Sequence, residues 1–442
     1  MKLIVNLIFK TLLVFIIFFY FMISTLAIAS NLFIDTTYKA TVRSYLSHYA
    51  FNKNNHINSN NKNFNIVQPR NFNQIEWSIN HPLNKNLDFY IWNVNNFVPL
   101  RHKGRLLEGN LRFHTNQYII QIGKVRVNWG SGFGRDPFDI FQKYPMTSFD
   151  PDNEPQLQEG TNLLLSNYSN EICSATFVLS DRSNEKPRIS GWQAASKVSL
   201  KLNNTEFIGL VHRRFGMDSS IGIGSNTLIT DNIILRTALL TTDLRDRGIG
   251  ILQSPPIFIG QKLILPARYA FTNNMSQKGQ FYRLLLDVDY TFADSQLLQL
   301  VYYSTTHGYS TNEWNIITDG IRASNQLLAW NQTNYPFTSV SGNPYRAFLL
   351  NVGSTLSNVP LRKNYLSLHY STNQKFQKWQ LKFSAEKCLD DHSLVYDLGV
   401  NYYLTDSLTI NPSLTVFRGK PITQYGLTPN KLIAKVLLRL DL

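Results

Sequence analysis

The stretch GKVRVNWGSGFGRDPFDIFQ, residues 123 to 142, combines the residue types most often used for chemistry. Closely spaced glycines surround a serine and are followed by basic and acidic residues, as in phosphate-binding loops and nucleophilic serine sites. A P-loop needs Gly-x4-Gly-Lys-Ser/Thr at the start of a helix, and no lysine follows these glycines. A nucleophile elbow needs Gly-x-Ser-x-Gly, whereas Ser131 has glycine on both immediate sides. We therefore expect no catalytic residue here, and the role of the stretch depends on the elements that position it.

Acids and histidines elsewhere offer two further candidate sites. Asp150, Asp152 and Glu154 alternate along the chain, and oxygen ligands so spaced can hold a calcium ion. Neither a glycine turn nor a closing glutamate follows at EF-hand spacing, which favours a solvated acidic loop without metal. The histidines lack the spacing of zinc sites. Ser367 and His369, which share one strand face, are the nearest approach to a catalytic pair, and no cofactor is expected.

The N-terminus has the pattern of an export signal. Lys2 and Lys10 precede an apolar run from Leu12 to Ala29 that ends in small residues, which predicts a signal peptide at 1–29 and one further domain at 30–442. An uncleaved anchor helix is the alternative, because about 18 apolar residues can span a bilayer. No second apolar stretch of this length occurs, so a bundle of membrane helices is excluded.

Long strands with alternating apolar and polar residues recur through the rest of the chain. In LVYDLGVNY, residues 394 to 402, apolar and aromatic side chains occupy every second position, and WQLKFSAE and the C-terminus repeat the pattern. RLLEGNLRFH repeats it as well, with Leu107, Leu111 and Phe113 on the apolar face. Alternation of this kind indicates a sheet with one apolar and one polar face. The strands run roughly 9–12 residues, close to the ~9–11 that a tilted strand needs to cross a membrane.

Short turns rich in Asn, Asp and Ser separate these strands, because such residues tolerate tight-turn conformations. Eight of them pair sixteen strands, and one more strand is expected at each end, near 34–49 and 431–442. The predicted turns begin at residues 81, 115, 168, 203, 230, 293, 372 and 404. The sequence therefore predicts an all-β fold, a transmembrane antiparallel up-and-down β-barrel of about 18 strands (16–18). Pro412 inside a strand does not fit this pattern, since proline removes a ladder donor.

Longer segments at 51–64, 130–158, 243–280 and 306–362 are predicted to be long extracellular loops. In the last of them, EWNIITDGIRASNQLL places Trp314, Ile317, Ile321 and Leu328 on one face of a short loop helix. This helix would either cap the lumen or pack on the barrel rim.

The stretch at 123–142 is then interpreted as a strand that ends and leaves the wall of the predicted barrel. Trp129 is expected at the membrane interface, where an indole ring is half apolar and half wet. The glycines after it let the backbone turn sharply. Arg135, Asp136 and Asp139 begin a loop that either folds inward to narrow the pore or lies over the rim.

The polar faces of the strands carry charges of both signs, with a slight excess of basic residues. The pore-lining candidates are Arg112, Lys197, Lys201, Arg236, Arg283, Asp287, Asp289, Lys382, Glu386, Lys435 and Arg439, with Glu108, Asp397 and Asp441 on the same faces. Such a wall leans mildly toward anions, and a selectivity ring would need the charges at one height. Cys173 and Cys388 are expected at opposite ends of the barrel and unpaired.

Several motifs resemble those of one group of membrane proteins. The strand pattern Gly-basic-x-x-hydrophobic-x-Trp-Gly is matched by Gly123, Lys124, Val127, Trp129 and Gly130, and an aspartate follows at 136 or 139. Together with THGYSTNEW (306–314), LDDHS (389–393) and FRGKPITQYG (417–426), it is similar to porin-like outer-membrane β-barrel families of Gram-negative bacteria and, more distantly, to alginate-export barrels. Such barrels usually end in phenylalanine, whereas this chain ends in Leu442.

The resemblance implies an outer-membrane channel for passive diffusion of small solutes through a polar lumen. Its expected partners are outer-membrane lipid and lipopolysaccharide, the barrel-assembly machinery and small solutes, with no nucleic acid despite a formal net charge of +14. The alternatives are a barrel for export or surface binding of polysaccharide or lipid, and an outer-membrane hydrolase. Long polar loops on a membrane barrel predict location in the outer membrane of a Gram-negative bacterium.

Overall fold

The structure is a computed structural model and describes residues 36–53, 57, 71–98, 101–130, 136–141, 159–181, 191–254, 257–259, 262–265, 268–334, 348–349, 352, 362–372, 378–428 and 430–442. The predicted signal peptide at 1–29 lies outside these residues.

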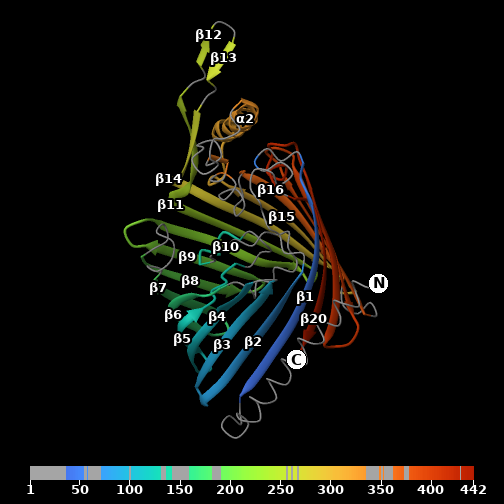
Figure 1. Cartoon of the computed structure of the whole chain (residues 1–442). Helices are drawn as coiled ribbons and strands as arrows, with labels where there is room; N and C mark the ends of the chain where they lie inside the picture. The colour runs from blue at the N-terminus through green and yellow to red at the C-terminus, as the bar shows by residue number, and fades with distance from the viewer. Residues whose placement is uncertain are drawn as a thin grey trace.

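Eighteen antiparallel strands form one closed sheet, and a separate two-stranded ribbon extends from it (Figure 1). The barrel strands of the first half are β1 (Thr37–Phe51), β2 (Asn71–Asn84), β3 (Leu87–Val98), β4 (Arg101–His114), β5 (Tyr118–Val125), β6 (Thr161–Ser169), β7 (Cys173–Asp181), β8 (Trp192–Leu202), β9 (Thr205–Arg214) and β10 (Ser219–Thr230). Those of the second half are β11 (Ile233–Ser254), β14 (Arg268–Thr291), β15 (Leu297–Thr305), β16 (Asn364–Ser371), β17 (Trp379–Cys388), β18 (Leu394–Tyr403), β19 (Leu408–Arg418) and β20 (Asn430–Asp441). The ribbon consists of β12 (Ile257–Ile259) and β13 (Lys262–Leu265).

The first and last strands close the barrel. β1 pairs with β2 on one side and with β20 on the other, in a register that runs from Thr41 opposite Asp441 to Phe51 opposite Asn430. Leu442 N donates to Ala40 O at 2.8 Å, so the ladder continues to the last residue. The predicted antiparallel barrel of about 18 strands is confirmed, and a strand connection lies at each of the eight predicted turn sites. The end of the barrel that carries these eight turns is called the short-turn end below, and the opposite end the long-loop end.

Alternation decides which side chains face outward. On β10, Ile221 and Ile223 are 61% and 63% exposed on the outer face, while Gly222 between them is buried on the inner face. A membrane barrel needs this arrangement, because its outer face contacts lipid and its inner face encloses polar groups.

One expected outward residue turns inward. The sequence pattern places Leu107 with Leu111 and Phe113, but a register shift between Trp92 and Asn93 marks a β-bulge that inserts an extra residue into β4. Leu106 takes the exposed position and Leu107 becomes fully buried. A bulge changes the facing of a side chain in this way because two residues oppose one on the partner strand.

The segment at 243–280 is not the loop that the sequence predicts. β11 runs for 22 residues and β14 for 24, and the two pair from Ile233 opposite Tyr290 to Ser254 opposite Arg268. This hairpin projects beyond the long-loop end of the wall and carries β12 and β13 at its tip (Figure 1). The sequence pattern is interrupted by prolines at 255, 256 and 266, which lie outside the described residues, while the described parts of β11 and β14 are paired.

The predicted loop helix is present as α2 (Thr311–Asn334), which extends beyond the patterned segment at both ends. Ser310 caps it, because its backbone N–H donates to Glu313 Oε2 at 2.8 Å and its hydroxyl to the same oxygen at 2.6 Å. Trp314, Ile317 and Ile321 bury the predicted apolar face against loop residues that include Phe348 and Leu349. The helix lies at the long-loop end beside β11 and β14 (Figure 1), and the side chain of Leu328 lies outside the described residues. Within the described chain, no helix is both long and apolar enough to cross a membrane.

The proline within β19 has a structural explanation. Pro412 pairs in register with Val436 of β20, while the ladder with β18 passes from Gly399 opposite Ser413 to Tyr402 opposite Ile410. Asn411 Nδ2 instead donates to Asn401 Oδ1 across this interval. Pro412 has no backbone N–H to donate, and it lies where the ladder between β18 and β19 is interrupted. The side-chain hydrogen bond between Asn411 and Asn401 joins the two strands there.

Candidate functional site

The opening stretch of the sequence leaves the wall and enters the barrel. Pairing of β5 ends at Val125, and the residues after it pack on the inner wall. Trp129 is 6% exposed inside the barrel, so its expected position at the membrane interface is wrong. Once the chain leaves the ladder, strand alternation no longer determines where its side chains point. The described parts of this segment, 126–130 and 136–141, are called the inner segment below.

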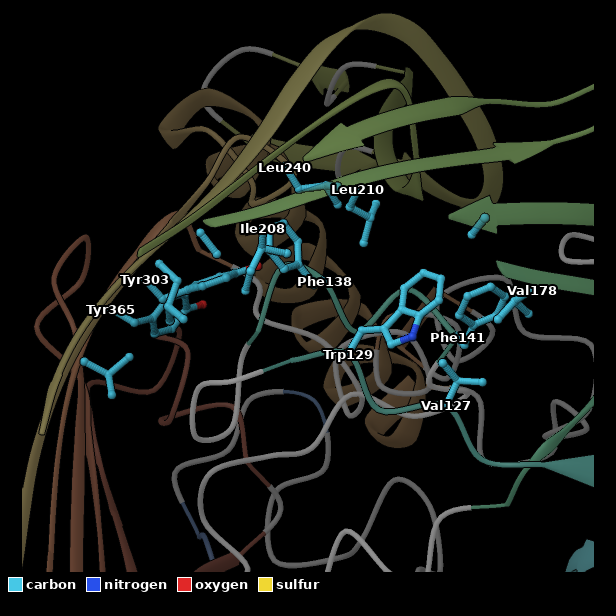
Figure 2. Packing of buried hydrophobic residues seen from close by; sticks show 14 of the residues in the cluster. Val127, Trp129, Phe138, Phe141, Val178, Ile208, Leu210, Leu240, Tyr303 and Tyr365 are labelled. Atoms are coloured by element: carbon cyan, nitrogen blue, oxygen red, sulfur yellow. The ribbon is translucent and has the colours of Figure 1, made fainter. Parts of the chain in front are cut away.

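Phe138 attaches the inner segment to the wall. Its ring is 1% exposed and lies over Gly222 and Gly224 of β10 (Figure 2). A Cβ added at Gly222 would lie 2.6 Å from Phe138 Cε1, and one at Gly224 would lie 3.0 Å from Phe138 Cε2. Both glycines occupy inward positions, so their missing side chains create the space that the ring fills.

Aromatic contacts and one lysine hold the rest of the inner segment. The rings of Trp129 and Phe141 pack edge to face with centroids 5.2 Å apart, and Phe141 lies in the same way 6.1 Å from His212 of β9. Lys197 Nζ donates to Trp129 O at 3.3 Å. Figure 2 shows Val127 and Val178 beside the rings of Trp129 and Phe141, and Ile208, Leu210 and Leu240 nearer to Phe138.

Asp136 and Asp139 shape the turn inside the lumen. Phe138 N donates to Asp136 Oδ1 at 2.8 Å, and Gly130 N donates to Asp139 Oδ1 at 2.8 Å. A Cβ at Gly130 would lie 2.5 Å from Asp136 Cβ, so only glycine allows this close approach. Burial raises the pKa of Asp139 to about 7, and the neighbouring Asp136 charge adds to the rise against backbone hydrogen bonds and Lys197.

The eleven pore-lining candidates all occupy inward positions, which alternate along each strand with outward-facing side chains. Three of them form a buried cluster. Arg236 of β11 lies 2.5 Å from Asp289 and 3.2 Å from Asp287 of β14, and Gln299 Nε2 donates to both oxygens of Asp287 at 3.0 and 2.9 Å. The Asp287 side chain is completely buried, so one arginine offsets two carboxylates that would otherwise repel each other.

Other charged side chains of the wall also have local partners. Glu108 pairs with Arg126, which lies 4.0 Å above the ring of Trp92, and Arg439 pairs with Asp441 at 2.9 Å. Glu386 accepts hydrogen bonds from Ser367 and Tyr425, and Asp397 accepts one from Thr415.

A group of basic residues is left without an ion pair. Among the described residues, Arg112, Lys201, Arg283 and Lys382 make no salt bridge, although Arg112 lies 5.6 Å from the Tyr90 ring centroid. Arg112, Lys201 and Lys382 lie close to the short-turn ends of β4, β8 and β17. Arg283 lies higher, opposite the last residue of β15. Arg112 lies opposite Asp88 and Lys201 opposite Glu206 in the strand ladders, so acidic residues occupy this end of the lumen as well.

The remaining candidates are separate from this site. Arg135, Asp150, Asp152 and Glu154 lie outside the described residues, and within the described chain no three acids, histidines or cysteines gather as metal ligands. Ser367 and His369 are buried on the inner face of β16. Cys173 begins β7 at the short-turn end and Cys388 ends β17 at the long-loop end; both thiols are free.

Two features of the inner face are missing from the sequence prediction. The buried pair of Arg43 and Glu76 joins β1 to β2 on the inner face, and Arg43 is 2% exposed. The contact of Phe138 with Gly222 and Gly224 could have been found from Ile-Gly-Ile-Gly at 221–224, where two successive inward positions of a strand are glycine. That pattern indicates close approach by another chain segment.

Comparison with solved structures finds the same architecture over nearly the whole chain. OccK11 (OpdR) of Pseudomonas aeruginosa is 10% identical, with 93% of this chain and 96% of that chain covered and a TM-score of 0.52. The fold is that of an outer-membrane barrel. OccD3 (OpdP) from the same organism is 11% identical over 92% of this chain and 91% of that one, with a TM-score of 0.51. The outer membrane protein opdK is 7% identical over 93% and 99%, with a TM-score of 0.53. No family model matches the sequence, and no curated protein matches it.

Proposed function

We propose that this chain is a porin-like channel in the outer membrane of a Gram-negative bacterium, through which small solutes diffuse passively. The observation that carries the proposal is a closed 18-stranded barrel with an apolar outer face, a charged inner face and a chain segment docked inside it. A barrel of about 16–18 strands is wide enough to hold water. The inner segment narrows that space, and no covalent chemistry is required.

The eleven inward residues line the pore in this proposal. Arg236 and Arg439 are paired with acids, whereas Arg112, Lys201 and Lys382, near the short-turn end, make no salt bridge among the described residues. The short-turn end faces the periplasm in this proposal, because bacterial outer-membrane barrels have their short turns on the periplasmic side. Outer-membrane lipid, lipopolysaccharide and the barrel-assembly machinery are its proposed partners.

The proposed channel function makes a direct prediction about the ionic current. Protein refolded into a planar bilayer should show stable ohmic steps with a mild preference for anions, because basic residues slightly outnumber acidic ones among the inward charged positions predicted from the strand pattern. The measurement is single-channel current together with the reversal potential in a salt gradient. A bilayer that stays silent at high protein concentration contradicts the proposal.

Export of an acidic polysaccharide would need a continuous basic track along the lumen. In the described chain, acids interrupt such a track at Glu108, Asp287, Asp289 and Glu386. A hydrolase at Ser367 would need a serine that substrate can reach, whereas its hydroxyl is buried and donates to Glu386 at 2.9 Å. The channel is therefore the better supported function.

Docking of the inner segment should depend on pH. The pKa of Asp139 is raised to about 7 in the docked segment, above its ordinary value of 3.8, so the neutral carboxyl favours docking. The stabilisation of the docked segment by neutral Asp139 is complete below about pH 4 and is lost as the pH rises through 7. Conductance should therefore increase between pH 5 and 8, as ionised Asp139 faces Asp136 and escapes burial.

The substitution Asp139→Asn removes this titration and should flatten the conductance profile between pH 5 and 8. Lys197 and His212 of the wall also contact the inner segment, and Asp136 within it lies beside Asp139. Lys201→Gln, a change near the short-turn end and away from these groups, serves as a control that should keep the pH dependence. An Asp139→Asn channel with the wild-type profile would assign the titration to another group.

A further inference from the structure

Two cations lie on the otherwise apolar outer face of β17, β18 and β19. Lys387 of β17 lies opposite Leu394 of β18, and Leu394 lies opposite Arg418 of β19, so the three form one row across the sheet. Both cations are exposed, whereas the residues before them in the chain, Glu386 and Phe417, lie on the inner face. Neighbouring strands are about 4.8 Å apart, which places the backbones of the two cations about 10 Å from each other. Lys387, Leu394 and Arg418 are called the cation row below.

The cation row lies at the edge of the apolar band that contacts lipid. At the short-turn end of the same strands, the rings of Trp379 and Tyr402 pack on the outer face with centroids 4.3 Å apart, as aromatic residues do at a membrane interface. Lys387 follows Trp379 by eight positions, which corresponds to about 26 Å along the strand and about 20 Å across the membrane at a tilt of about 40°. The apolar band of such barrels is about 25 Å tall, so the cation row lies near its opposite edge.

The charges of the cation row have no acidic partner within the described chain. Neither Lys387 nor Arg418 makes a salt bridge with the described residues, and the other outward positions of these three strands carry no acid. Asp390, which follows β17, already accepts hydrogen bonds from two backbone N–H groups and from the Asn364 amide. Arg418 lies 5.6 Å from the ring centroid of Tyr396, which holds its guanidinium against the outer face. Cations so placed attract an anionic headgroup.

An apolar surface for acyl chains continues from the cation row toward the short-turn end. Leu398 of β18 and Leu414 of β19 lie opposite each other on the outer face and are 43% and 38% exposed. Leu368 of β16, opposite Ala385 of β17, widens this surface. A lipid whose headgroup contacts the cation row therefore places its chains on apolar side chains of the same strands.

We propose that the cation row binds the phosphorylated headgroup of an outer-leaflet lipid, the lipid A part of lipopolysaccharide; the proposal rests on the periplasmic orientation of the short-turn end given above. In that orientation the cation row faces the outer leaflet, where lipopolysaccharide is concentrated. The planar guanidinium of Arg418 matches two oxygens of one phosphate, and Lys387 supplies a point charge to a second phosphate of the same headgroup. The site would hold one lipid molecule in a fixed position on the barrel wall.

The test is the affinity of the full chain in detergent micelles for lipid A, taken from native mass spectra recorded at increasing lipid concentration. Combining Lys387→Gln with Arg418→Gln should raise the dissociation constant about tenfold, since two charge-assisted contacts with phosphate are lost. Combining Lys387→Arg with Arg418→Lys keeps both charges and should keep most of the affinity. Arg213→Gln is the matched control, because Arg213 is an exposed cation at the same end of β9, where its ladder neighbour Ser219 bonds the acid Asp243.

Each result separates the lipid site from the channel. Equal dissociation constants for the wild type and the double glutamine variant, equal weakening by Arg213→Gln, or equal affinity for lipid A and its dephosphorylated form would overturn the site. Displacement of lipid A by millimolar inorganic phosphate would assign the cation row to a free anion and overturn the lipid as its ligand. Because both cations lie on the outer face, the double glutamine variant should conduct ions as the wild type does. A silent bilayer with intact lipid A binding would reject the channel and leave the site.

Discussion

Replacing Gly222 with valine is expected to displace Phe138 from the inner wall, to release the inner segment and to raise the single-channel conductance. The first added carbon would lie 2.6 Å from Phe138 Cε1 and 3.1 Å from Leu240 Cδ1, and valine adds two further methyl groups. The ring cannot remain where it is, because β10 is fixed in the wall by β9 and β11. Loss of a buried phenylalanine contact costs about 3–5 kcal/mol, a factor of at least about a hundred in the ratio of docked to released segment.

Two further variants make this prediction decisive. Phe138→Ala removes the ring without changing the barrel wall, so it should raise the conductance even if Gly222→Val folds poorly. Gly209→Val on β9 is the control, because a Cβ at Gly209 meets nothing within 4 Å. Wild-type conductance in both Gly222→Val and Phe138→Ala, with folding intact, would show that the inner segment does not limit the current.

Elements governed by local patterns could be predicted from the sequence. The eight short turns follow from residues suited to tight turns, and the count of eighteen strands follows from pairing them. The facing of Arg236, Asp287 and Lys382 follows from strict alternation within single strands. The wrong placement of Leu107 has the same origin, because a bulge is a property of two strands together and changes the alternation only in one of them.

Contacts between distant segments could not be predicted in this way. Trp129 carries an interface signal, but its position is decided by an inner wall that β7 to β11 and β14 to β18 assemble. The pairing of Arg236 with two carboxylates depends on the register between β11 and β14, which join across the projecting hairpin rather than through a short turn. Alternation places these charges on the inner face but does not say which of them neutralise one another.

That pairing is the basis of the second large effect. Arg236→Met should destabilise the folded barrel by about 3–5 kcal/mol, because it leaves two buried carboxylates facing each other without a counter-charge. Asp287 is fully buried and Asp289 nearly so, so water cannot take the place of the guanidinium. Methionine keeps much of the volume, and the loss therefore reports on charge rather than on a cavity. The measurement is the denaturant concentration at the midpoint of unfolding in detergent micelles.

Neutralising the acids should reverse the loss. In Arg236→Met combined with Asp287→Asn and Asp289→Asn, the repulsion is removed, and the Asp287→Asn amide still has an oxygen that can accept from Gln299, so most of the stability should return. Arg322→Met on α2 is the matched control, since its pair with Asp319 is half exposed at both ends and such pairs contribute about 0–1 kcal/mol. Equal midpoints for Arg236→Met and the wild type would contradict this prediction. They would mean that the carboxyl groups of Asp287 and Asp289 are already neutral in the barrel and need no compensation by the Arg236 charge.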